Sequence, residues 1–219
     1  MPLPPSTRTR IKICGLTRDE DVDAAVDAGA DAIGLVFYPR SPRHVALAQA
    51  ERLARRLPPF VTPVGLFVNA TPDDIAAAVS AIPHLVLQFH GDERPDDCTR
   101  AARPFLRAAR MAPGFDLLNF ALQYPDAQAL LLDAHVEGYG GGGKVFDWSL
   151  IPRGVSLPLV LSGGLHAENV LEGILQVRPS AVDVSSGVEL AKGIKDARAI
   201  RRFCDAVREA DARRAAAPT

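Results

Sequence analysis

A thiol and an amine lie two residues apart near the start of the chain. In "RIKICGL" (10–16), Lys12 and Cys14 fall on the same face of an expected strand, because side chains alternate along an extended backbone. A cysteine in a strand is most often a small buried apolar residue. Together with other polar groups, such a thiol could instead take part in proton transfer.

Polar side chains also stand at the ends of three later apolar runs. The runs are "LVLQFH" (85–90), "ALLLDA" (129–134) and "AVDVSS" (181–186), and they carry Gln88, His90, Asp133 and Asp183. A single carboxylate at the end of a strand is often only a helix cap. A thiol, an imidazole and two carboxylates around one opening would instead suit general acid–base catalysis.

Short apolar runs recur along the chain and alternate with amphipathic or alanine-rich stretches. The eight runs are "IKIC", "AIGLVF", "TPVGLFV", "LVLQFH", "PFLRAAR", "ALLLDA", "LPLVLS" and "AVDVSS". Each stretch between them is long enough for one crossover helix. Thr17 with Glu20 has the spacing of a capping box at the start of a helix. Thr71 followed by Pro72 has the pattern of an N-cap with proline in the first helical position.

Eight βα units in 219 residues predict an α/β fold, a single closed (β/α)8 TIM barrel. We expect the barrel to be the catalytic domain at residues 10–210, with a disordered extension at 1–9 and a frayed tail at 211–219. An open doubly wound sheet is the alternative that the same alternation allows. In a barrel the reactive groups lie where strands end and βα loops begin, so the polar residues above are expected around one mouth.

Two glycine-rich loops follow the last two expected strands. They are "LSGGL" (161–165) and "DVSSGV" (183–188), and they contain Gly163, Gly164, Ser185, Ser186 and Gly187. Glycines of this kind can simply make tight turns. However, the loops after the seventh and eighth strands are where barrels commonly hold a phosphate with backbone N–H groups. We therefore predict that these five residues bind a phosphate.

A third glycine run, "GYGGGGKV" (138–145), matches the spacing G-x-x-x-x-G-K of a nucleotide-binding loop. Val145 follows the lysine, so the hydroxyl that would hold Mg²⁺ is missing. We instead expect a mobile loop that can close over a substrate.

The composition limits the partners of the chain. A formal net charge of −1 leaves no basic face for nucleic acid, and no apolar run approaches the ~20 residues of a membrane span. Three cysteines, an odd number, favour a reducing compartment over a disulfide framework. We therefore expect a cytoplasmic protein that binds a small phosphorylated sugar without a metal or another cofactor. It could be a monomer or a homodimer, because the sequence of an outer helix face is similar whether that face is exposed to solvent or paired with a second subunit.

Several of these stretches together resemble the phosphoribosylanthranilate isomerase family, (β/α)8 enzymes of tryptophan biosynthesis. The matching strings are "KICGLT", "GADAIGLVFYPRSPRHV", "VGLFVN", "LQFHGDE", "LLLDA", "YGGGGKVFDWSLI", "LVLSGGLHAENV" and "AVDVSSGVE". They follow one another in order from about Arg10 to Phe203. The family usually has "QLHG" where this chain has "QFHG", but position 89 is expected to point outward to the helices.

The resemblance implies a role for several residues. Cys14 would be the general base, Asp133 the general acid, and Arg43 in "SPRHV" the group that holds the anthranilate carboxylate. The polar positions Gln88, His90 and Asp183 would orient the substrate. As a base Cys14 must be a thiolate, which an ordinary thiol forms only to a few per cent near pH 7, so Lys12 would supply the positive charge that lowers its pKa. The implied reaction is an Amadori rearrangement of N-(5′-phosphoribosyl)anthranilate, an aldose–ketose isomerisation that needs no cofactor.

Two other functions remain open at this point. The chain could be a phosphate-sugar-binding barrel without catalysis, although such a protein would need Arg43 and not both Cys14 and Asp133. It could also be a relaxed isomerase that accepts the analogous substrate of the histidine pathway. The corresponding family typically has an aspartate where this chain has Cys14, which disfavours that alternative.

Overall fold

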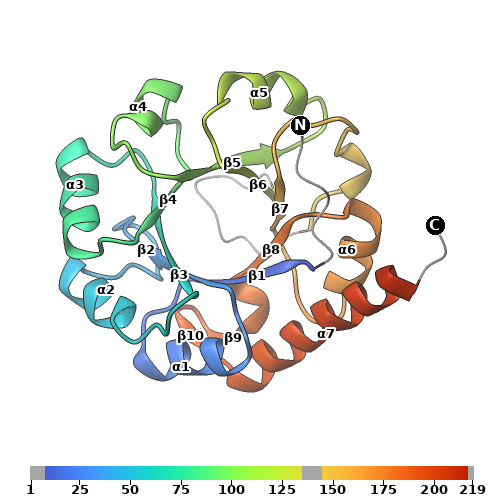
Figure 1. Ribbon diagram of the computed structural model, residues 1–219, viewed down its shortest axis with the longest axis horizontal. Helices are drawn as coiled ribbons and strands as arrows, with labels where there is room; N and C mark the ends of the chain where they lie inside the picture. The colour runs from blue at the N-terminus through green and yellow to red at the C-terminus, as the bar shows by residue number, and fades with distance from the viewer. Residues whose placement is uncertain (1–7, 135–144, 217–219) are drawn as a thin grey trace.

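Strands β1 to β8 pair side by side in chain order, and β8 also pairs with β1, so the sheet closes into a barrel in this computed structural model (Figure 1). The strands are Arg10–Cys14, Ala32–Val36, Thr62–Phe67, Val86–Phe89, Phe105–Met111, Ala129–Ala134, Leu159–Leu161 and Ala181–Val184. The structure describes residues 8–134 and 145–216. All pairs in the barrel are parallel, which confirms the predicted (β/α)8 class and excludes the open sheet.

Helices surround the barrel (Figure 1). They are α1 (Asp19–Asp27), α2 (Leu47–Ala54), α3 (Pro72–Ala81), α4 (Pro95–Thr99), α5 (Leu117–Gln123), α6 (Val170–Val177) and α7 (Ala197–Ala216). After β8 come the 3₁₀ turn η2 (Ser186–Val188) and a hairpin of β9 (Glu189–Ala191) and β10 (Ile194–Lys195).

The described part of the connection between β6 and β7 lacks the crossover helix that we predicted. Between β6 and β7 the structure describes residues 145–158, and these contain the 3₁₀ turn η1 (Trp148–Leu150) instead of an α-helix. Pro152 and Pro158 disfavour a continuous helix here. Trp148 packs against Gly173 of α6 and so covers this side of the barrel. The glycine-rich segment 138–143, predicted to be a mobile cover, lies outside the described residues.

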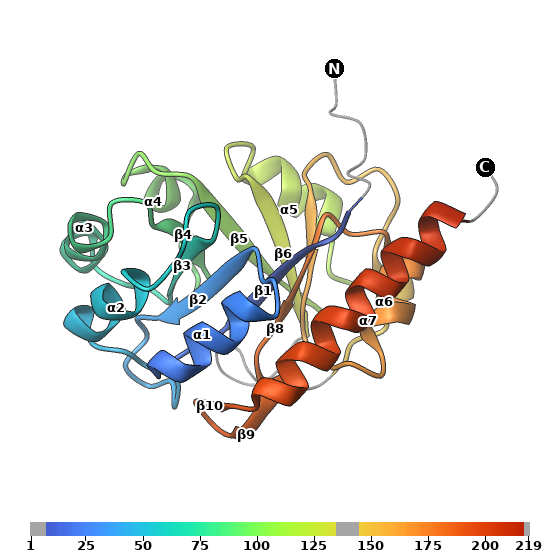
Figure 2. The ribbon, with the colours of Figure 1, turned by 60° about the horizontal axis from the view of Figure 1, so that its bottom comes forward.

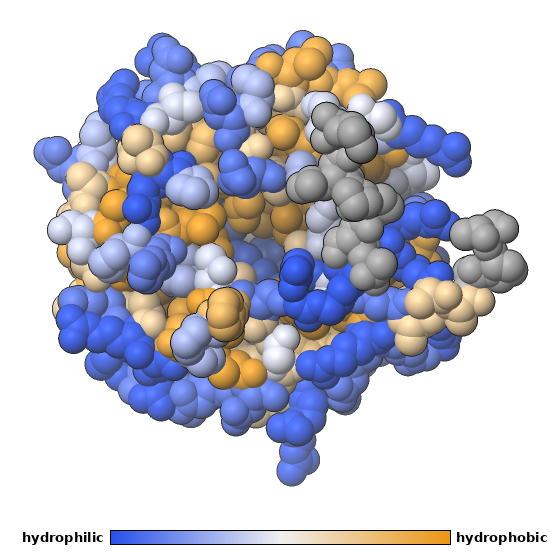
Figure 3. Space-filling model, in the orientation of Figure 1, coloured by the Kyte–Doolittle hydropathy of each residue, from blue (hydrophilic) through white to orange (hydrophobic). Residues whose placement is uncertain are grey.

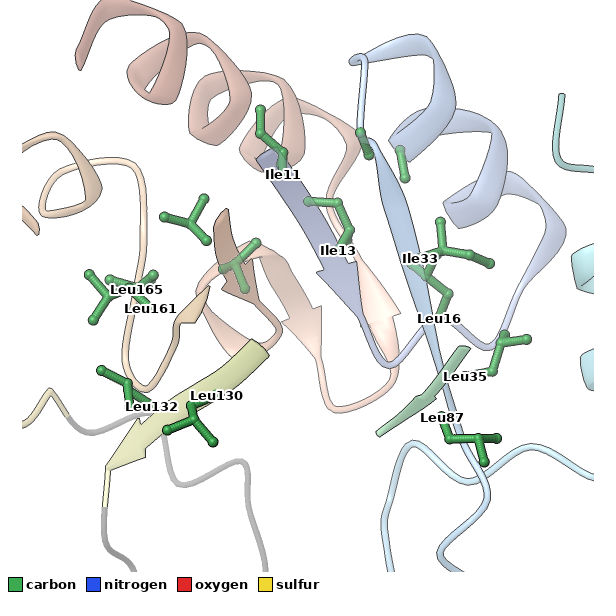
Figure 4. Close-up of a cluster of buried hydrophobic side chains, with 14 of the residues drawn as sticks. Ile11, Ile13, Leu16, Ile33, Leu35, Leu87, Leu130, Leu132, Leu161 and Leu165 are labelled. Atoms are coloured by element: carbon green, nitrogen blue, oxygen red, sulfur yellow. The ribbon is translucent and has the colours of Figure 1, made fainter. Parts of the chain in front are cut away.

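The main hydrophobic core lies between the strands and the helices. On β1, Ile11 and Ile13 belong to this core and lie on the side of α7 (Figure 4). Because side chains alternate along a strand, Lys12 and Cys14 point into the barrel.

The barrel interior has a smaller apolar cluster of its own. Its buried members are Ala108, Ala129, Leu131 and Val160. On β6, Leu130 and Leu132 lie in the outer core (Figure 4), so Leu131 and Asp133 share the inner face. Phe89 is buried in the outer core, which confirms that position 89 points away from the barrel mouth.

The ends of the folded region differ from the expected boundaries. Helix α7 continues to Ala216, so residues 211–216, which we expected to be frayed, are helical. Thr9, expected in a disordered extension, is buried, and both its N–H and its hydroxyl donate to the Asp211 carboxylate, at 2.8 and 2.7 Å. The start of β1 and the end of α7 lie at the end of the barrel opposite the β9–β10 hairpin (Figure 2).

One of the two predicted helix caps is confirmed. Thr71 is the N-cap of α3 and accepts a hydrogen bond from the N–H of Asp74. The capping box at Thr17 and Glu20 is wrong, because α1 begins at Asp19 with Arg18 as its N-cap. The hydroxyl of Thr17 instead donates to the carbonyl oxygen of Gly193 in the β9–β10 connection, at 2.5 Å.

Hydrophilic residues occupy much of the outer surface in view, and smaller hydrophobic areas lie between them (Figure 3). Among residues 8–134 and 145–216, no helix combines the length and the apolar character needed to cross a membrane.

The bond between Thr9 and Asp211 predicts a measurable contribution to stability. Asp211→Ala removes the acceptor of the Thr9 N–H and of the Thr9 hydroxyl hydrogen, so we expect the free energy of unfolding to fall by about 1–3 kcal/mol. Urea denaturation measures this loss. The control is Asp205→Ala, which removes an exposed ion pair to Arg208 on the same helix and should change stability by less than about 1 kcal/mol. Equal losses in both variants would contradict the assignment.

Candidate active site

A cavity of about 340 Å³ opens at the carboxyl ends of the barrel strands. Its lining includes ten of the residues singled out in the sequence: Cys14, Arg43, Gln88, His90, Asp133, Gly163, Gly164, Asp183, Ser185 and Ser186. The geometry therefore brings the thiol, the imidazole and both carboxylates to one mouth. Lys12 lies one layer below, buried beneath the cavity floor. A larger cavity of about 730 Å³ lies between α3 and α4 and contains none of these groups.

Cys14 ends β1 beside Gly34 of β2, its partner in the strand register. A Cβ atom at position 34 would lie only 2.6 Å from the Cys14 sulfur and 3.0 Å from its Cα. Glycine at this position therefore makes room for the thiol inside the barrel. Cys14 is buried, with 4% of its surface exposed.

Closure of the barrel places Lys12 beside Asp183. The two residues are register partners on β1 and β8, and Lys12 Nζ lies 2.9 Å from Asp183 Oδ1 in a buried ion pair. Burial acts to lower the pKa of Lys12, but the Asp183 carboxylate and the Cys14 sulfur outweigh it, so the pKa of Lys12 is raised. The lysine is therefore charged directly below the thiol.

Burial raises the pKa of the Cys14 thiol, and this is the largest influence on it. The Lys12 ammonium acts in the opposite direction, as we predicted, and so does Lys195, whereas Asp183 adds to the rise. The net result differs from a simple activation by Lys12, because the desolvated thiol is held above its ordinary pKa. Lys12 limits this rise and does not reverse it.

Asp133 ends a chain of three polar side chains. His90 Nε2 lies 3.1 Å from Asp133 Oδ2, and His90 Nδ1 lies 3.2 Å from Gln88 Nε2. The other carboxylate oxygen of Asp133 accepts the N–H of Ala134 at 2.9 Å. All three side chains are buried at the mouth, so the imidazole holds the carboxyl group in one orientation.

The two predicted phosphate loops meet beside the cavity. Gly163, Gly164, Ser185 and Ser186 line it, but Gly187 does not. A Cβ atom at position 187 would lie 1.9 Å from the carbonyl oxygen of Leu165, so Gly187 lets the loop after β8 pack against the loop after β7. Gly187 therefore allows the two loops to pack closely and does not itself line the cavity.

Arg43 lines the cavity but is already paired. Its Nε and Nη2 donate to the two carboxylate oxygens of Glu189, at 2.7 and 2.8 Å. Lys195 also donates to Glu189, at 2.9 Å, and to the backbone carbonyl of Ser185, at 3.0 Å. Our sequence reasoning assigned no role to Glu189 or Lys195, although Glu189 is the last residue of the string "AVDVSSGVE".

The other two thiols lie outside the cavity. Cys98 in α4 and Cys204 in α7 are buried and free. Burial raises the pKa of Cys98 to about 12 and that of Cys204 to about 11, so both remain protonated at neutral pH. Within the described residues, no group of three His, Cys, Asp or Glu side chains could hold a metal ion.

A closed (β/α)8 barrel with a thiol and a carboxyl group facing one cavity, beside glycine and serine loops after β7 and β8, defines a barrel enzyme of the acid–base type. A family model described as N-(5′phosphoribosyl)anthranilate (PRA) isomerase matches residues 11–206. The chain belongs to this isomerase family.

Known proteins agree with this assignment over nearly the whole chain. The N-(5′-phosphoribosyl)anthranilate isomerase of Methylibium petroleiphilum is 75% identical over 209 residues, which cover 95% of this chain and 98% of the relative. That of Leptothrix cholodnii is 75% identical over 206 residues, or 94% of each chain.

Two solved structures are similar in fold and sequence. The phosphoribosyl anthranilate isomerase of Thermotoga maritima has a TM-score of 0.85 and 43% identity, over 92% of this chain and 99% of that one. A phosphoribosyl anthranilate isomerase in complex with reduced 1-(o-carboxyphenylamino)-1-deoxyribulose 5-phosphate has a TM-score of 0.82 and 41% identity, with the same coverage.

The contact between Gly34 and Cys14 predicts a specific effect on catalysis. Gly34→Ala places a methyl group against the sulfur, so we expect kcat/KM for the family's substrate to fall at least about tenfold, with about 1–3 kcal/mol of overpacking strain. The matched control is Gly65→Ala in β3, whose Cβ would meet the outward-lying Leu85, Phe67 and Phe37 at 3.0–3.1 Å. The control should lose stability and keep its activity. Equal activity losses in both variants would contradict a role for the Gly34 contact.

Proposed function

We propose that the chain performs its family's reaction in the 340 Å³ cavity, with Cys14 as general base and Asp133 as general acid. As a member of the family it is an isomerase of tryptophan biosynthesis. It converts N-(5′-phosphoribosyl)anthranilate to 1-(2-carboxyphenylamino)-1-deoxyribulose 5-phosphate. The observation that carries the mechanism is that both groups line one cavity, between the loops after β7 and β8 and the guanidinium of Arg43.

The cavity has a separate place for each end of the substrate. The phosphate is bound by the loops at Gly163, Gly164, Ser185 and Ser186, and the anthranilate carboxylate by Arg43. The ribose then spans the cavity between β1 and β6, which leaves Cys14 and Asp133 on different sides of the sugar. A solved relative holds a compound with the same phosphate and carboxylate groups, which supports this arrangement.

Asp133 begins the reaction by giving a proton to the furanose ring oxygen, so that the ring opens to a Schiff base. For this step its carboxyl group must carry the proton. Gln88 Oε1 is buried and has no hydrogen-bond partner among the described residues. If the amide is turned by half a rotation, that oxygen accepts from His90 Nδ1–H, and His90 Nε2 then accepts from a protonated Asp133. In the orientation described above, Gln88 Nε2 donates to His90 Nδ1, so His90 Nε2–H donates to the Asp133 carboxylate. The turned amide is the arrangement that permits a protonated Asp133.

Cys14, as a thiolate, completes the reaction by removing the C2′ proton of the Schiff base. The electron pair of the C–H bond moves to give an enolamine, which tautomerises to the ketone. Gln88, His90 and Asp183 orient the substrate from the same mouth. Asp183 acts mainly by holding Lys12.

No cofactor is needed for these proton transfers, and we propose none. We also propose a cytoplasmic location, in keeping with the cysteine content of the chain. The state of association that we propose is a monomer or a homodimer, which sedimentation of the purified protein distinguishes.

Removing either proton-transfer group should abolish most of the activity. We expect Cys14→Ala and Asp133→Asn each to lower kcat by about 10²- to 10⁴-fold, because each removes one acid or base from the reaction. The loss of anthranilate fluorescence during turnover measures the rate. Either variant retaining more than half of the wild-type kcat would remove that residue from the mechanism.

The same assay separates the alternative functions. Wild-type protein that binds the substrate but does not turn it over would be a phosphate-sugar-binding barrel. Turnover of the histidine-pathway analogue in competition with the anthranilate substrate would show a relaxed isomerase.

The Lys12 ammonium predicts a shift in pH dependence. The kcat/KM value should rise with pH as Cys14 ionises, and Lys12 lowers the pKa of Cys14. Lys12→Met therefore moves this rise to higher pH and lowers the activity at pH 7, whereas Lys12→Arg keeps the charge and stays closer to the wild type. A pH profile of kcat/KM measures both. An unchanged profile in Lys12→Met would exclude the electrostatic role.

A further inference from the structure

The β9–β10 hairpin carries two buried charged side chains that the mechanism above does not use. It follows β8 and η2 and lies at the cavity end of the barrel (Figure 2). Glu189 and Lys195 are opposite each other in its antiparallel register, and both side chains are buried. Leu190 between them along the chain is largely exposed. The hairpin thus turns its charged face toward the barrel.

Glu189 is the centre of a buried ionic cluster. Its Oε1 accepts from Arg43 Nε at 2.7 Å and from Lys195 Nζ at 2.9 Å, and its Oε2 accepts from Arg43 Nη2 at 2.8 Å. The exposed fractions of the side chains are 9% for Arg43, 5% for Glu189 and 0% for Lys195. Buried ions are costly, so such a cluster is weak evidence for stability and better explained by the geometry that it enforces.

The contacts of Arg43 leave one edge of its guanidinium for a ligand. Glu189 occupies the Nε–Nη2 edge, and none of the hydrogen bonds of Arg43 to other described residues uses Nη1. Arg43 lines the cavity, so the Nη1–Nη2 edge is the one that can bind a planar carboxylate with two parallel bonds.

The stem of Arg43 is held as well as its head. A Cβ atom at Gly15 would lie 2.5 Å from Arg43 Cδ, so the side chain packs directly on the backbone after β1. The charges agree with this geometry. Two cations and one carboxylate leave one positive charge unbalanced, which complements a single carboxylate of the ligand.

We propose that Glu189 is a positioning residue that fixes the guanidinium of Arg43 for the carboxylate of the anthranilate group. Lys195 bonds Glu189 from the other side and anchors it to the backbone of Ser185 in the phosphate loop. The hairpin therefore keeps the carboxylate site at a constant distance from the phosphate site. This inference rests on the proposed role of Arg43.

Glu189→Gln tests the proposal, because it keeps the size of the side chain and removes its charge. We expect KM to rise about tenfold or more, in line with the loss of charge-assisted hydrogen bonds, with kcat changed much less. Glu189→Asp keeps the charge and should raise KM less. Glu51→Gln is the control, since Glu51 pairs with Arg55 on an exposed helix face and should leave KM unchanged.

A substrate analogue without the carboxylate, N-(5′-phosphoribosyl)aniline, separates positioning from general damage. We expect the Glu189→Gln variant and the wild type to have the same kcat/KM for this analogue. Arg43→Met combined with Glu189→Gln should be no worse than Arg43→Met alone, because both changes remove one interaction. Equal losses with both substrates, or additive losses in the double variant, would overturn the proposal.

Arg43→Met by itself separates a failure of the proposed role of Arg43 from a failure of the proposed role of Glu189. If this variant keeps the wild-type KM for the anthranilate substrate, the proposed role of Arg43 fails. If it raises KM while Glu189→Gln and Glu189→Asp do not, only the role of Glu189 fails. Circular dichroism of each variant confirms that the barrel is folded before the kinetics are compared.

Discussion

The closure of the parallel sheet between β1 and β8 is the constraint on which the site depends. It aligns Lys12 with Asp183, residues far apart in the sequence, and turns both into the barrel. An isolated ammonium or carboxylate would be very costly there, but the pair is within 2.9 Å and satisfies both charges. The same register leaves Cys14 one inward position further along β1, above a cation and beside the cavity.

Burial and the charge of Lys12 act in opposite directions on the pKa of Cys14. Desolvation disfavours the Cys14 thiolate and so limits Cys14 as a base. Lys12 reduces this penalty without removing it. At the other side of the mouth, His90 Nε2 lies 3.1 Å from Asp133 Oδ2 and holds this carboxyl group toward the cavity. The barrel mouth thus holds the thiol above the Lys12–Asp183 ion pair and the carboxyl group against the imidazole of His90.

Much of this arrangement could be predicted from the sequence, and the exceptions have physical reasons. The eight strands and the inward positions of Cys14, Gln88 and Asp133 follow from period-two alternation, which is a local property. The partner of Lys12 depends on barrel register, and the roles of Glu189 and Lys195 on a hairpin that packs across the β2–α2 loop. The Thr17 hydroxyl donates to the distant carbonyl oxygen of Gly193, and α1 begins at Asp19 with Arg18 as its N-cap. Tertiary contacts of this kind cannot be predicted from the spacing of residues in the sequence.

The central claim is that one substrate, bound in one orientation, contacts the phosphate loops, Cys14, Asp133 and Arg43 at the same time. A crystal structure of this protein with the reduced product analogue tests it most directly. The account predicts the phosphate against Gly163, Gly164, Ser185 and Ser186, the ring carboxylate on the Nη1–Nη2 edge of Arg43, and C2′ in contact with the Cys14 sulfur. An analogue bound in the reverse direction, or with C2′ out of reach of that sulfur, would contradict it.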